Sequence, residues 1–266
     1  MTRIELIEVK VERKSANFDL VDVILDAIRI NREEVLDGDI LAISSKFVAM
    51  AENRVVNLSK VQLTERGKRL SRELGIAPPL AELVEQEADL VFSGVEGLAL
   101  AVKDHVLTPN AGIDRTNVFP NHVILFPRHP FESAKSIRSA ILKGVNRSVG
   151  VVLTDSRLMP TRLGTTGVAI AVAGIQASKD ERGRKDLFGN ILRVTQRAIA
   201  DDISSAAQLL MGEADEGIPL VIVRGSGIEI SDREAKRDGM SVDYKDCIYV
   251  RGLTDSSLIK RLEGLA

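Results

Sequence analysis

The sequence predicts an α+β protein, because short apolar runs typical of buried strands occur in the same chain as longer segments with helical periodicity. Three apolar runs have the length of strands, at 40–43, 149–153 and 219–225. Residues 20–28 instead carry apolar side chains at positions i, i+3, i+4 and i+7, which is the pattern of an amphipathic helix. No internal repeat or change in composition divides the chain, so we expect one domain over residues 1–266.

The first half of the chain contains most of the predicted elements. Residues 3–11 alternate apolar and polar side chains, and Asn17 or Asp19 is a candidate cap for the helix that follows. A turn at 37–39 precedes the strand 40–43, and the following helices end at a glycine or begin at a pair of prolines. The elements expected up to residue 143 are strands 3–11, 40–43, 90–92, 98–102, 105–107 and 123–126 and helices 20–28, 64–74, 78–87 and 132–143.

The second half is expected to supply the centre of the core. Strand 149–153 is followed by 167–174, where small side chains indicate a close neighbour. Charged residues crowd the segment 180–189, and apolar residues at helical spacing then predict one long helix over 191–211. Strand 219–225 and a helix over 254–265 complete the chain, while 226–247 is polar and without clear periodicity.

The composition excludes several classes of protein. Lys and Arg number 36 against 38 Asp and Glu, and only 3% of residues are aromatic, so neither a basic field nor stacking platforms are available for nucleic acid. One cysteine and three histidines argue against a disulfide framework or a zinc cluster, so any metal is expected to be held by oxygen ligands. The N-terminus is read as a strand, and the longest nearly uncharged run, 163–178, is too short and too rich in glycine for a membrane span. We therefore expect a cytoplasmic protein.

Three acidic loops are the candidate functional site. Thr154, Asp155 and Ser156 follow directly on a buried strand, and strand ends hold ligands rigidly while the adjoining loop admits substrate. The other two loops are 108–117, with Asp114 and Asn117, and 211–219, with Glu213. An Asp that caps a turn is the alternative for Asp155 alone. A shared polyvalent cation accounts for all three loops together.

Two further residues have less certain roles. Lys46 follows two serines at the end of strand 40–43, where it either binds phosphate or is an ordinary surface lysine. Glu213 lies just beyond the last turn of the predicted helix 191–211, and a carboxylate is disfavoured there by the helix dipole. A nearby cation would explain the position of Glu213.

Several motifs resemble those of the γ-glutamyl ligases that add glutamate to the deazaflavin coenzyme F420. The resemblance covers nearly the whole chain in the same order and is densest from 108 to 225. The motifs are 110–114 with Asn117, Thr154-Asp155, 183–189, 210–213 with Asp215, 217–219 and 223–225. The resemblance implies the mixed α+β fold of that family and an intertwined homodimer.

The activity implied by the resemblance is a GTP-dependent ligation. A terminal carboxylate of the coenzyme F420 precursor is phosphorylated, and the amine of L-glutamate attacks the acyl phosphate to give an amide, GDP and phosphate. Two divalent cations, Mg²⁺ or Mn²⁺, serve this chemistry, and family members can also use K⁺.

Site residues follow from the resemblance position by position. It implies Asp114 and Asp155 as ligands of one metal, and Ser156 and Glu213 as ligands of the second. Asp155 and Arg162 are the catalytic candidates. The residues expected to bind nucleotide are Ser45, Lys46, Asn117, Met211, Gly212, Gly217 and Ile218.

The chain departs from the family pattern at three places. The N-terminal stretch 8–17 lacks the glycine or proline of the family's nucleotide loop, and Met50 stands where the family carries a lysine beside the phosphates, a role that Lys46 would take. Met159 replaces an arginine before Pro160. These changes leave three hypotheses open: the F420 precursor ligase, a sister ligase for another carboxylic acid or nucleotide, and a metal- and nucleotide-binding protein without turnover.

Overall fold

The chain folds around a five-stranded mixed sheet. The computed structural model describes residues 3–15, 17–232 and 239–254. The strand order is β1-β12-β2-β8-β9, with β2 and β8 parallel and the other neighbours antiparallel. The bounds are Glu5–Val9 for β1, Leu220–Arg224 for β12, Ile40–Ser44 for β2, Gly150–Leu158 for β8 and Thr165–Ala173 for β9. This mixed sheet with packed helices confirms the predicted α+β class.

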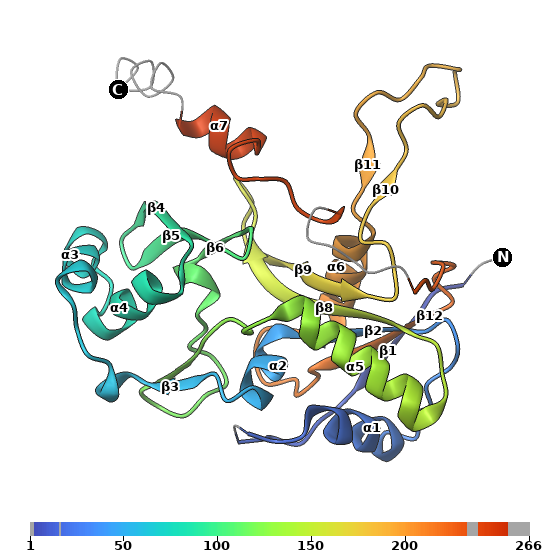
Figure 1. Cartoon of the computed structure of the whole chain (residues 1–266), viewed down its shortest axis with the longest axis horizontal. Coiled ribbons are helices and arrows are strands. Elements are labelled where there is room, and N and C mark those ends of the chain that lie inside the picture. Colours follow the sequence, from blue (N-terminus) through green and yellow to red (C-terminus); the bar gives the residue numbers. More distant parts are fainter. Residues whose placement is uncertain (1–2, 16, 233–238, 255–266) are drawn as a thin grey trace.

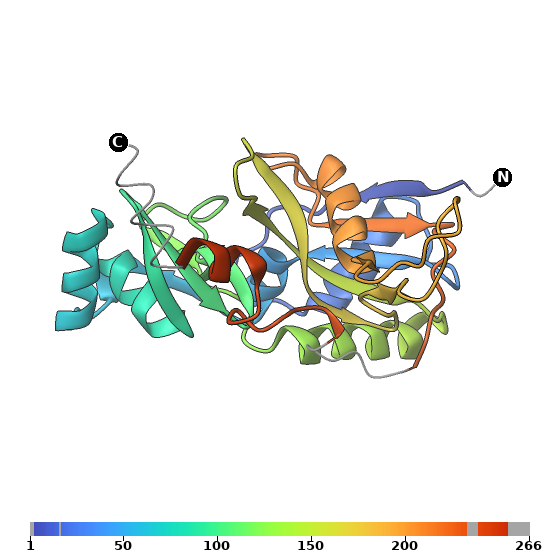
Figure 2. The same ribbon diagram turned by 90° about the horizontal axis from the view of Figure 1, so that it is seen from above.

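Helices cover both faces of the sheet (Figures 1 and 2). One face packs against α1 (Leu20–Ile30), α2 (Ser45–Ala51) and α5 (Pro130–Val145), and the other packs against α6 (Ile199–Met211). The central strands are therefore buried on both sides, which explains why β2 and the first half of β8 are continuous apolar runs. Among the described helices, none is long and apolar enough to cross a membrane.

A bulge interrupts the pairing of β8 with β9. Leu153 pairs with Ala171, but Thr154 pairs with Ala169, so Ile170 is an extra residue in β9. Ile170 and Ala171 consequently both pack into the same core cluster, below α5. Beyond the bulge, Gly167 lies so close to α6 that an added Cβ would be 2.2 Å from the carbonyl oxygen of Ser204. The predicted close neighbour of this strand is therefore α6.

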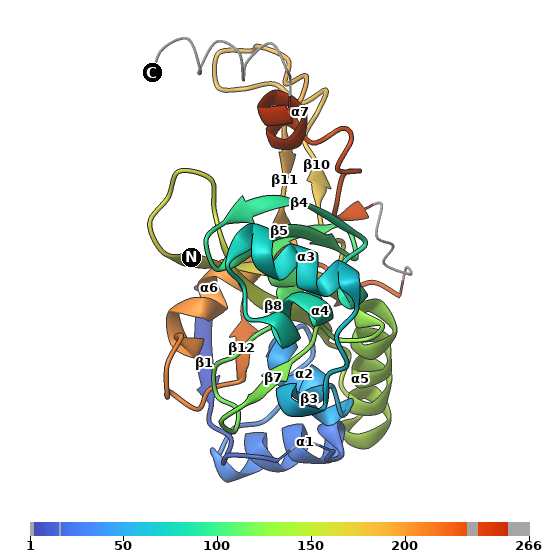
Figure 3. The ribbon, with the colours of Figure 1, turned by 90° about the vertical axis from the view of Figure 1, so that its left-hand side faces the viewer.

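Residues 55–125 form a smaller lobe with its own apolar core (Figure 3). A three-stranded antiparallel sheet, β4-β5-β6, packs with two helices, and a separate two-stranded ladder pairs β3 with β7. The bounds are β3 Val55–Asn57, η1 Leu58–Lys60, α3 Glu65–Leu74, α4 Pro78–Glu87, β4 Leu90–Val95, β5 Leu98–Lys103, β6 Val106–Pro109, η2 Asn110–Gly112 and β7 His122–Ile124. The hairpin β5–β6 leads into η2 and then to Asp114, as the sequence predicts.

Helix ends agree with the capping signals in the sequence. The choice between Asn17 and Asp19 is settled by geometry, because an Asp19 carboxylate oxygen accepts the N–H of Asp22 at 2.9 Å. α3 ends at Gly75, whose φ of 63° is in the left-handed region that glycine adopts without strain.

The prediction of one long helix over 191–211 was wrong in its first half. Residues 179–197 form an arm that projects from the body, closed at its base by β10 (Lys179–Asp180) and β11 (Gln196–Arg197), and α6 begins only at Ile199 (Figure 1). Ile191 and Val194, read as part of a buried helix face, are exposed. Their spacing matches a helix by coincidence, since apolar periodicity alone does not distinguish a packed helix from exposed apolar residues in an arm.

Two other boundaries differ from the prediction. β8 runs on to Leu158, so Thr154, Asp155 and Ser156 are strand residues paired with β9 and not loop residues. Ser45 and Lys46 begin the short helix α2, which the sequence analysis did not predict. Residues 255–265 of the predicted final helix lie outside the described residues, and α7 (Ile248–Thr254) precedes them.

Candidate active site

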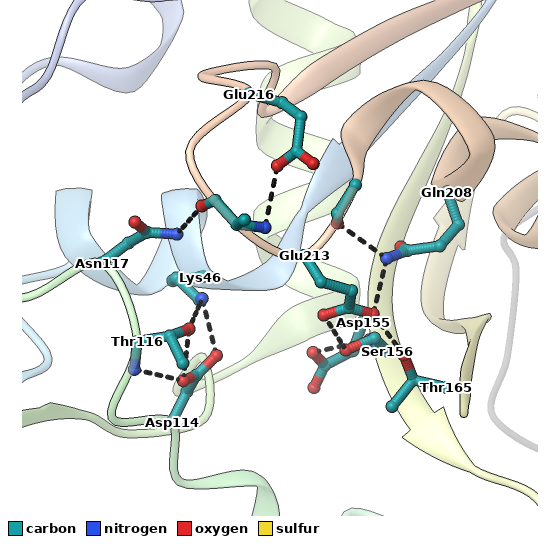
Figure 4. A network of polar contacts seen from close by, with 12 residues as sticks. Lys46, Asp114, Thr116, Asn117, Asp155, Ser156, Thr165, Gln208, Glu213 and Glu216 are labelled. Carbon is teal, nitrogen blue, oxygen red and sulfur yellow. Dashed lines mark hydrogen bonds and ion pairs between the residues drawn. The ribbon is translucent and has the colours of Figure 1, made fainter. Parts of the chain in front are cut away.

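A cavity of about 710 Å³ lies at the end of β2 and beside Thr154–Ser156 in the second half of β8. The first turn of α2, the segment after β6, the C-terminal end of α6 and the segment after β1 complete its wall. All three acidic loops of the sequence contribute to this cavity, through Asp114, Asp155 and the run from Met211 to Pro219. Figure 4 shows how their side chains face one another.

Asp114 is held in an ion pair with Lys46. The Lys46 ammonium lies 2.7 Å from Asp114 Oδ2 and donates to Thr116 Oγ1 at 2.6 Å. Thr116 in turn donates its main-chain N–H and its hydroxyl to Asp114 Oδ1. Burial raises the pKa of Asp114, but the charge of Lys46 and these hydrogen bonds outweigh it, so the pKa is lowered overall. Lys46 is therefore a residue of the cavity and not a free surface lysine.

Asp155 is partly buried beside this ion pair. Burial raises the pKa of its carboxyl to about 6, and the nearby charge of Asp114 adds to the rise. The main-chain N–H of Ser156, at 2.9 Å, and the hydroxyl of Ser45 act in the opposite direction. Ser45, one of the residues expected to bind nucleotide, is buried behind Asp155 and is not among the residues that line the cavity. The carboxylates of Asp114 and Asp155 repel each other when both are ionised, so a cation bound between them would stabilise the pair.

Glu213 occupies the opposite wall of the cavity and is held by neutral donors. Its carboxylate accepts hydrogen bonds from Ser156 Oγ at 3.3 Å, Gln208 Nε2 at 2.8 Å and the hydroxyl of Thr165. Ser156 and Glu213 therefore lie together, as the predicted second pair of ligands requires. Among the described residues, no three Asp, Glu, His or Cys side chains cluster closely enough to hold an ion by themselves. The donors are carboxylate and hydroxyl oxygens, a set that suits Mg²⁺ or Mn²⁺.

The loop after α6 is linked to the opposite wall by Asn117. The Asn117 amide donates to the carbonyl oxygen of Ala214 at 2.7 Å, across the cavity (Figure 4). All four residues of this run that were expected to bind nucleotide line the cavity: Met211, Gly212, Gly217 and Ile218.

Arg162 is the one predicted site residue that the structure places apart from the others. It is exposed in the turn between β8 and β9, where its main-chain N–H donates to the carbonyl oxygen of Met159. It is not among the residues that line the cavity. Its catalytic role stays a prediction.

Comparison with known proteins identifies the relatives of this chain. The family model for F420-0:Gamma-glutamyl ligase matches residues 8–225. The chain belongs to this family. A Coenzyme F420:L-glutamate ligase of Methanopyrus kandleri is 35% identical over 225 residues, 84% of this chain and 87% of the relative. The proteins of the same name from Methanocaldococcus jannaschii and Archaeoglobus fulgidus are 37% and 36% identical, over 75% and 79% of this chain and 80% and 82% of their own length.

The cavity lining of this family member also contains charged and polar residues that were not among the predicted site residues. Arg13 and Lys14 come from the segment after β1, and Gln208 comes from α6. Arg13 also lies over the ring of Phe119, 5.0 Å from its centre. Gln208 is three residues before Met211 on the predicted helix, a spacing that would have placed it on the same face. The family resemblance pointed to the stretch 8–17 as a whole, but nothing singled out Arg13 and Lys14 within it, because no periodic pattern orients residues in an irregular segment.

Proposed function

We propose that this protein is a GTP-dependent ligase that joins L-glutamate to the terminal carboxylate of the coenzyme F420 precursor. The observation that carries the proposal is the convergence of Asp114, Asp155 and Glu213 on one cavity in a chain that belongs to the F420-0:gamma-glutamyl ligase family. The relatives compared above cover most of the chain, and their name, Coenzyme F420:L-glutamate ligase, supports coenzyme F420 and L-glutamate as the pair that is joined.

The proposed reaction has two steps. An oxygen of the substrate carboxylate attacks the γ-phosphorus of GTP, and the bond to the bridging oxygen breaks to release GDP. The amine nitrogen of L-glutamate then attacks the acyl carbon, the bond to phosphate breaks, and the amine loses a proton as the amide forms.

The residues of the cavity suit these steps in different ways. Asp114 with Asp155, and Ser156 with Glu213, would hold two divalent ions, which screen the repulsion between a carboxylate and a triphosphate. The Lys46 ammonium, bonded to Asp114 and Thr116, is within the same cavity as a donor for phosphate oxygens. The Asn117 contact links the loop after α6 to the opposite wall, and so helps to position the two halves of the site relative to each other.

A sister ligase for a different carboxylic acid or nucleotide is the second candidate. It is favoured by Met50, which lines the cavity where the family pattern has a lysine. An apolar side chain at that position changes how a phosphate is held.

The decisive experiment is a mass-spectrometric assay with the glutamate-free coenzyme precursor, L-glutamate, GTP and Mn²⁺, run beside an ATP series. We expect a product heavier by one or more glutamyl units that is lost in Asp155→Asn. Metal-dependent nucleotide binding without this product would favour the sister ligase and direct the search to other acids. Absence of nucleotide binding would exclude both ligases.

We also propose that the protein is a homodimer in which the projecting arm contacts the second copy. The side chains of Leu187 and Phe188 are 100% and 92% exposed, and large apolar groups at a projecting tip are typical of an interface. Phe188→Ser should lower the mass measured by light scattering from twice 29.0 kDa toward 29.0 kDa. Leu209→Ser, which changes an exposed leucine on α6, is the control and should leave the mass unchanged. A wild-type mass of one chain would contradict the dimer.

A further inference from the structure

A second cavity, of about 370 Å³, adjoins the candidate active site. Val118 lines both cavities. In the loop before it, Asp114 and Asn117 line the first cavity, whereas Arg115 lines the second. The lining of the second cavity is completed by Leu58, Phe119, Pro120, Asn121 and His122. One short loop therefore supplies a candidate metal ligand to the first cavity and a guanidinium to the second.

Hydrogen bonds hold the wall of the second cavity in shape. Asp114 and Ile124 exchange main-chain N–H···O bonds of 2.9 and 2.8 Å at the base of the loop. The carbonyl oxygen of Asn121 accepts the N–H of Leu58 at 2.9 Å, and the Asn121 amide donates to the hydroxyl of Ser59. The loop is thus anchored on both sides, and a ligand would not have to order it on binding.

The two cavities differ in charge. Among the described residues that line the first cavity, six are acidic and three are basic, the latter being Arg13, Lys14 and Lys46. The described lining of the second cavity contains Arg115 and no acidic residue. Arg115 is exposed and makes no ion pair or hydrogen bond within the described part of the chain. An unpaired guanidinium offers two parallel N–H donors, a geometry that matches a carboxylate.

Two rings form the less polar part of the second cavity. The rings of Phe119 and His122 meet edge-on, with centres 6.4 Å apart. His122 Nδ1 lies 2.9 Å from the carbonyl oxygen of Pro120, which can only accept, so Nδ1 carries the proton. His122 Nε2 is left without a hydrogen-bond partner among the described residues. The cavity therefore combines a cation, a free ring nitrogen and an apolar surface, which suits a small acid with a short aliphatic chain.

We propose that the second cavity binds L-glutamate, with the Arg115 guanidinium paired to one of its two carboxylates. The inference rests on the proposed function, in which the amine of L-glutamate is the nucleophile and both carboxylates stay unreacted. Carboxylates placed in the first cavity would be repelled by its acidic residues. In the second cavity they avoid this repulsion, and the amine reaches the first cavity past Val118, which the two share.

The first test compares Arg115→Gln with Arg66→Gln in steady-state kinetics. Arg66 is an exposed arginine of α3 in the same lobe and lines neither cavity, so its variant controls for the loss of one positive charge. Arg115→Gln should raise the KM for L-glutamate at least about tenfold, since a charge-assisted contact is lost, while the KM for GTP changes less than about twofold. Arg66→Gln should leave both values unchanged. An unchanged KM for L-glutamate in Arg115→Gln, or a rise in the KM for the precursor alone, would overturn the proposal.

Arg115→Lys keeps the charge and covers a failure of Arg115→Gln to fold. It should recover part of the affinity for L-glutamate, because a lysine holds a carboxylate as a point charge but not through two parallel bonds. Affinity equal to that of the wild type would reject a bidentate pairing at Arg115.

L-Glutamine and L-isoglutamine provide a readout that needs no turnover. Each replaces one carboxylate of L-glutamate by an amide and keeps the free amine. Ligand-observed NMR should show that the wild type prefers L-glutamate about tenfold over the analogue that lacks the paired carboxylate. In Arg115→Gln this preference should disappear, because the carboxylate then has no partner. A wild type without either preference, or a variant that keeps both, would overturn the pairing.

These measurements separate the inference from the proposed function. A ligation product made by a wild type whose affinity for L-glutamate does not depend on Arg115 would retain the ligase and reject the second cavity as its glutamate site. Binding of L-glutamate that depends on Arg115, in a protein that forms no product with the coenzyme precursor, would support the cavity and count against ligation to that precursor.

Discussion

Asp114 and Glu213 are carboxylates on opposite walls of one cavity, but their charges are managed differently. Asp114 is paired with the Lys46 ammonium at 2.7 Å. Glu213 is exposed, and its hydrogen-bond donors within the described part of the chain are uncharged: Ser156, Thr165 and Gln208. Neutral donors orient a carboxylate but leave its charge in place, whereas a lysine neutralises it. We therefore expect a cation to bind at Glu213 directly, and to bind at Asp114 only with displacement or sharing of Lys46.

The largest effect is expected for removal of the charge of Asp155, the carboxylate that lies beside Asp114. Asp155→Asn should reduce turnover at least ~100-fold, the usual result of removing one preorganised electrostatic group. Its thermal midpoint in excess chelator should be unchanged or raised, because repulsion with Asp114 is relieved. A large fall of that midpoint would instead identify Asp155 as a structural residue.

The pH dependence of stability gives a second test of the burial of Asp155 beside Asp114. The pKa of Asp155 is raised from 3.8 to about 6, chiefly by burial and then by Asp114, so folding favours its protonated form. This contribution is complete below pH 4 and is lost as the pH rises through about 6. The metal-free wild type should therefore lose on the order of 2–3 kcal/mol relative to Asp155→Asn between pH 4 and pH 7.5. Urea denaturation at several pH values measures the difference, and parallel profiles for the two proteins would contradict it.

Substitution at the other wall should act on the cation more than on the fold. Glu213→Gln keeps the shape and one oxygen but removes the charge, so the affinity for Mn²⁺ should fall about tenfold while the thermal midpoint in chelator moves little. Isothermal titration with Mn²⁺ gives the affinity. Unchanged Mn²⁺ affinity would remove Glu213 from the ligand set and with it the contrast between the walls.

The smallest effect concerns Lys46. Lys46→Met should weaken GTP binding about fivefold and reduce its dependence on salt, because one charged contact to phosphate is lost. Lys60→Met, at an exposed lysine of η1 outside the cavity lining, is the matched control. If the two variants bind GTP with equal affinity, Lys46 pairs with Asp114 and makes no contact with a phosphate.

The core of the fold was predictable from sequence because burial on both faces leaves a clear pattern. Ile40–Ile43 of β2, the first half of β8 and Leu220–Val223 of β12 are unbroken apolar runs, and the caps at Asp19 and Gly75 are local signals. α2 escaped prediction since seven residues, four of them buried, give too short a pattern to distinguish a helix from a continued loop. Part of the arm was predicted as a helix because its apolar residues have helical spacing, although these residues do not pack into a core of the described chain.

The candidate site was predictable as a list of residues and not as an arrangement. The acidic loops suggested a shared site, but no sequence pattern predicts an ion pair between Lys46 and Asp114, since 68 positions separate them. The neutral donors of Glu213 come from β8, β9 and α6, and only the folded sheet brings them together. The metal ligands and the nucleotide contacts remain predictions.

The bulge at Ile170 determines which changes of chain length β9 can absorb. Ile170 is the residue in excess over β8, so its deletion would leave Leu153 paired with Ala171 and Thr154 with Ala169 in a regular ladder, with Gly167 still close to Ser204. An insertion between Gly167 and Ala169 would instead add a second extra residue, or would move a residue with a Cβ to the place of Gly167, against the α6 main chain. Changes of chain length during the divergence of this chain are therefore expected in the turn 159–164 or at the bulge itself, however freely single residues are exchanged elsewhere in β9.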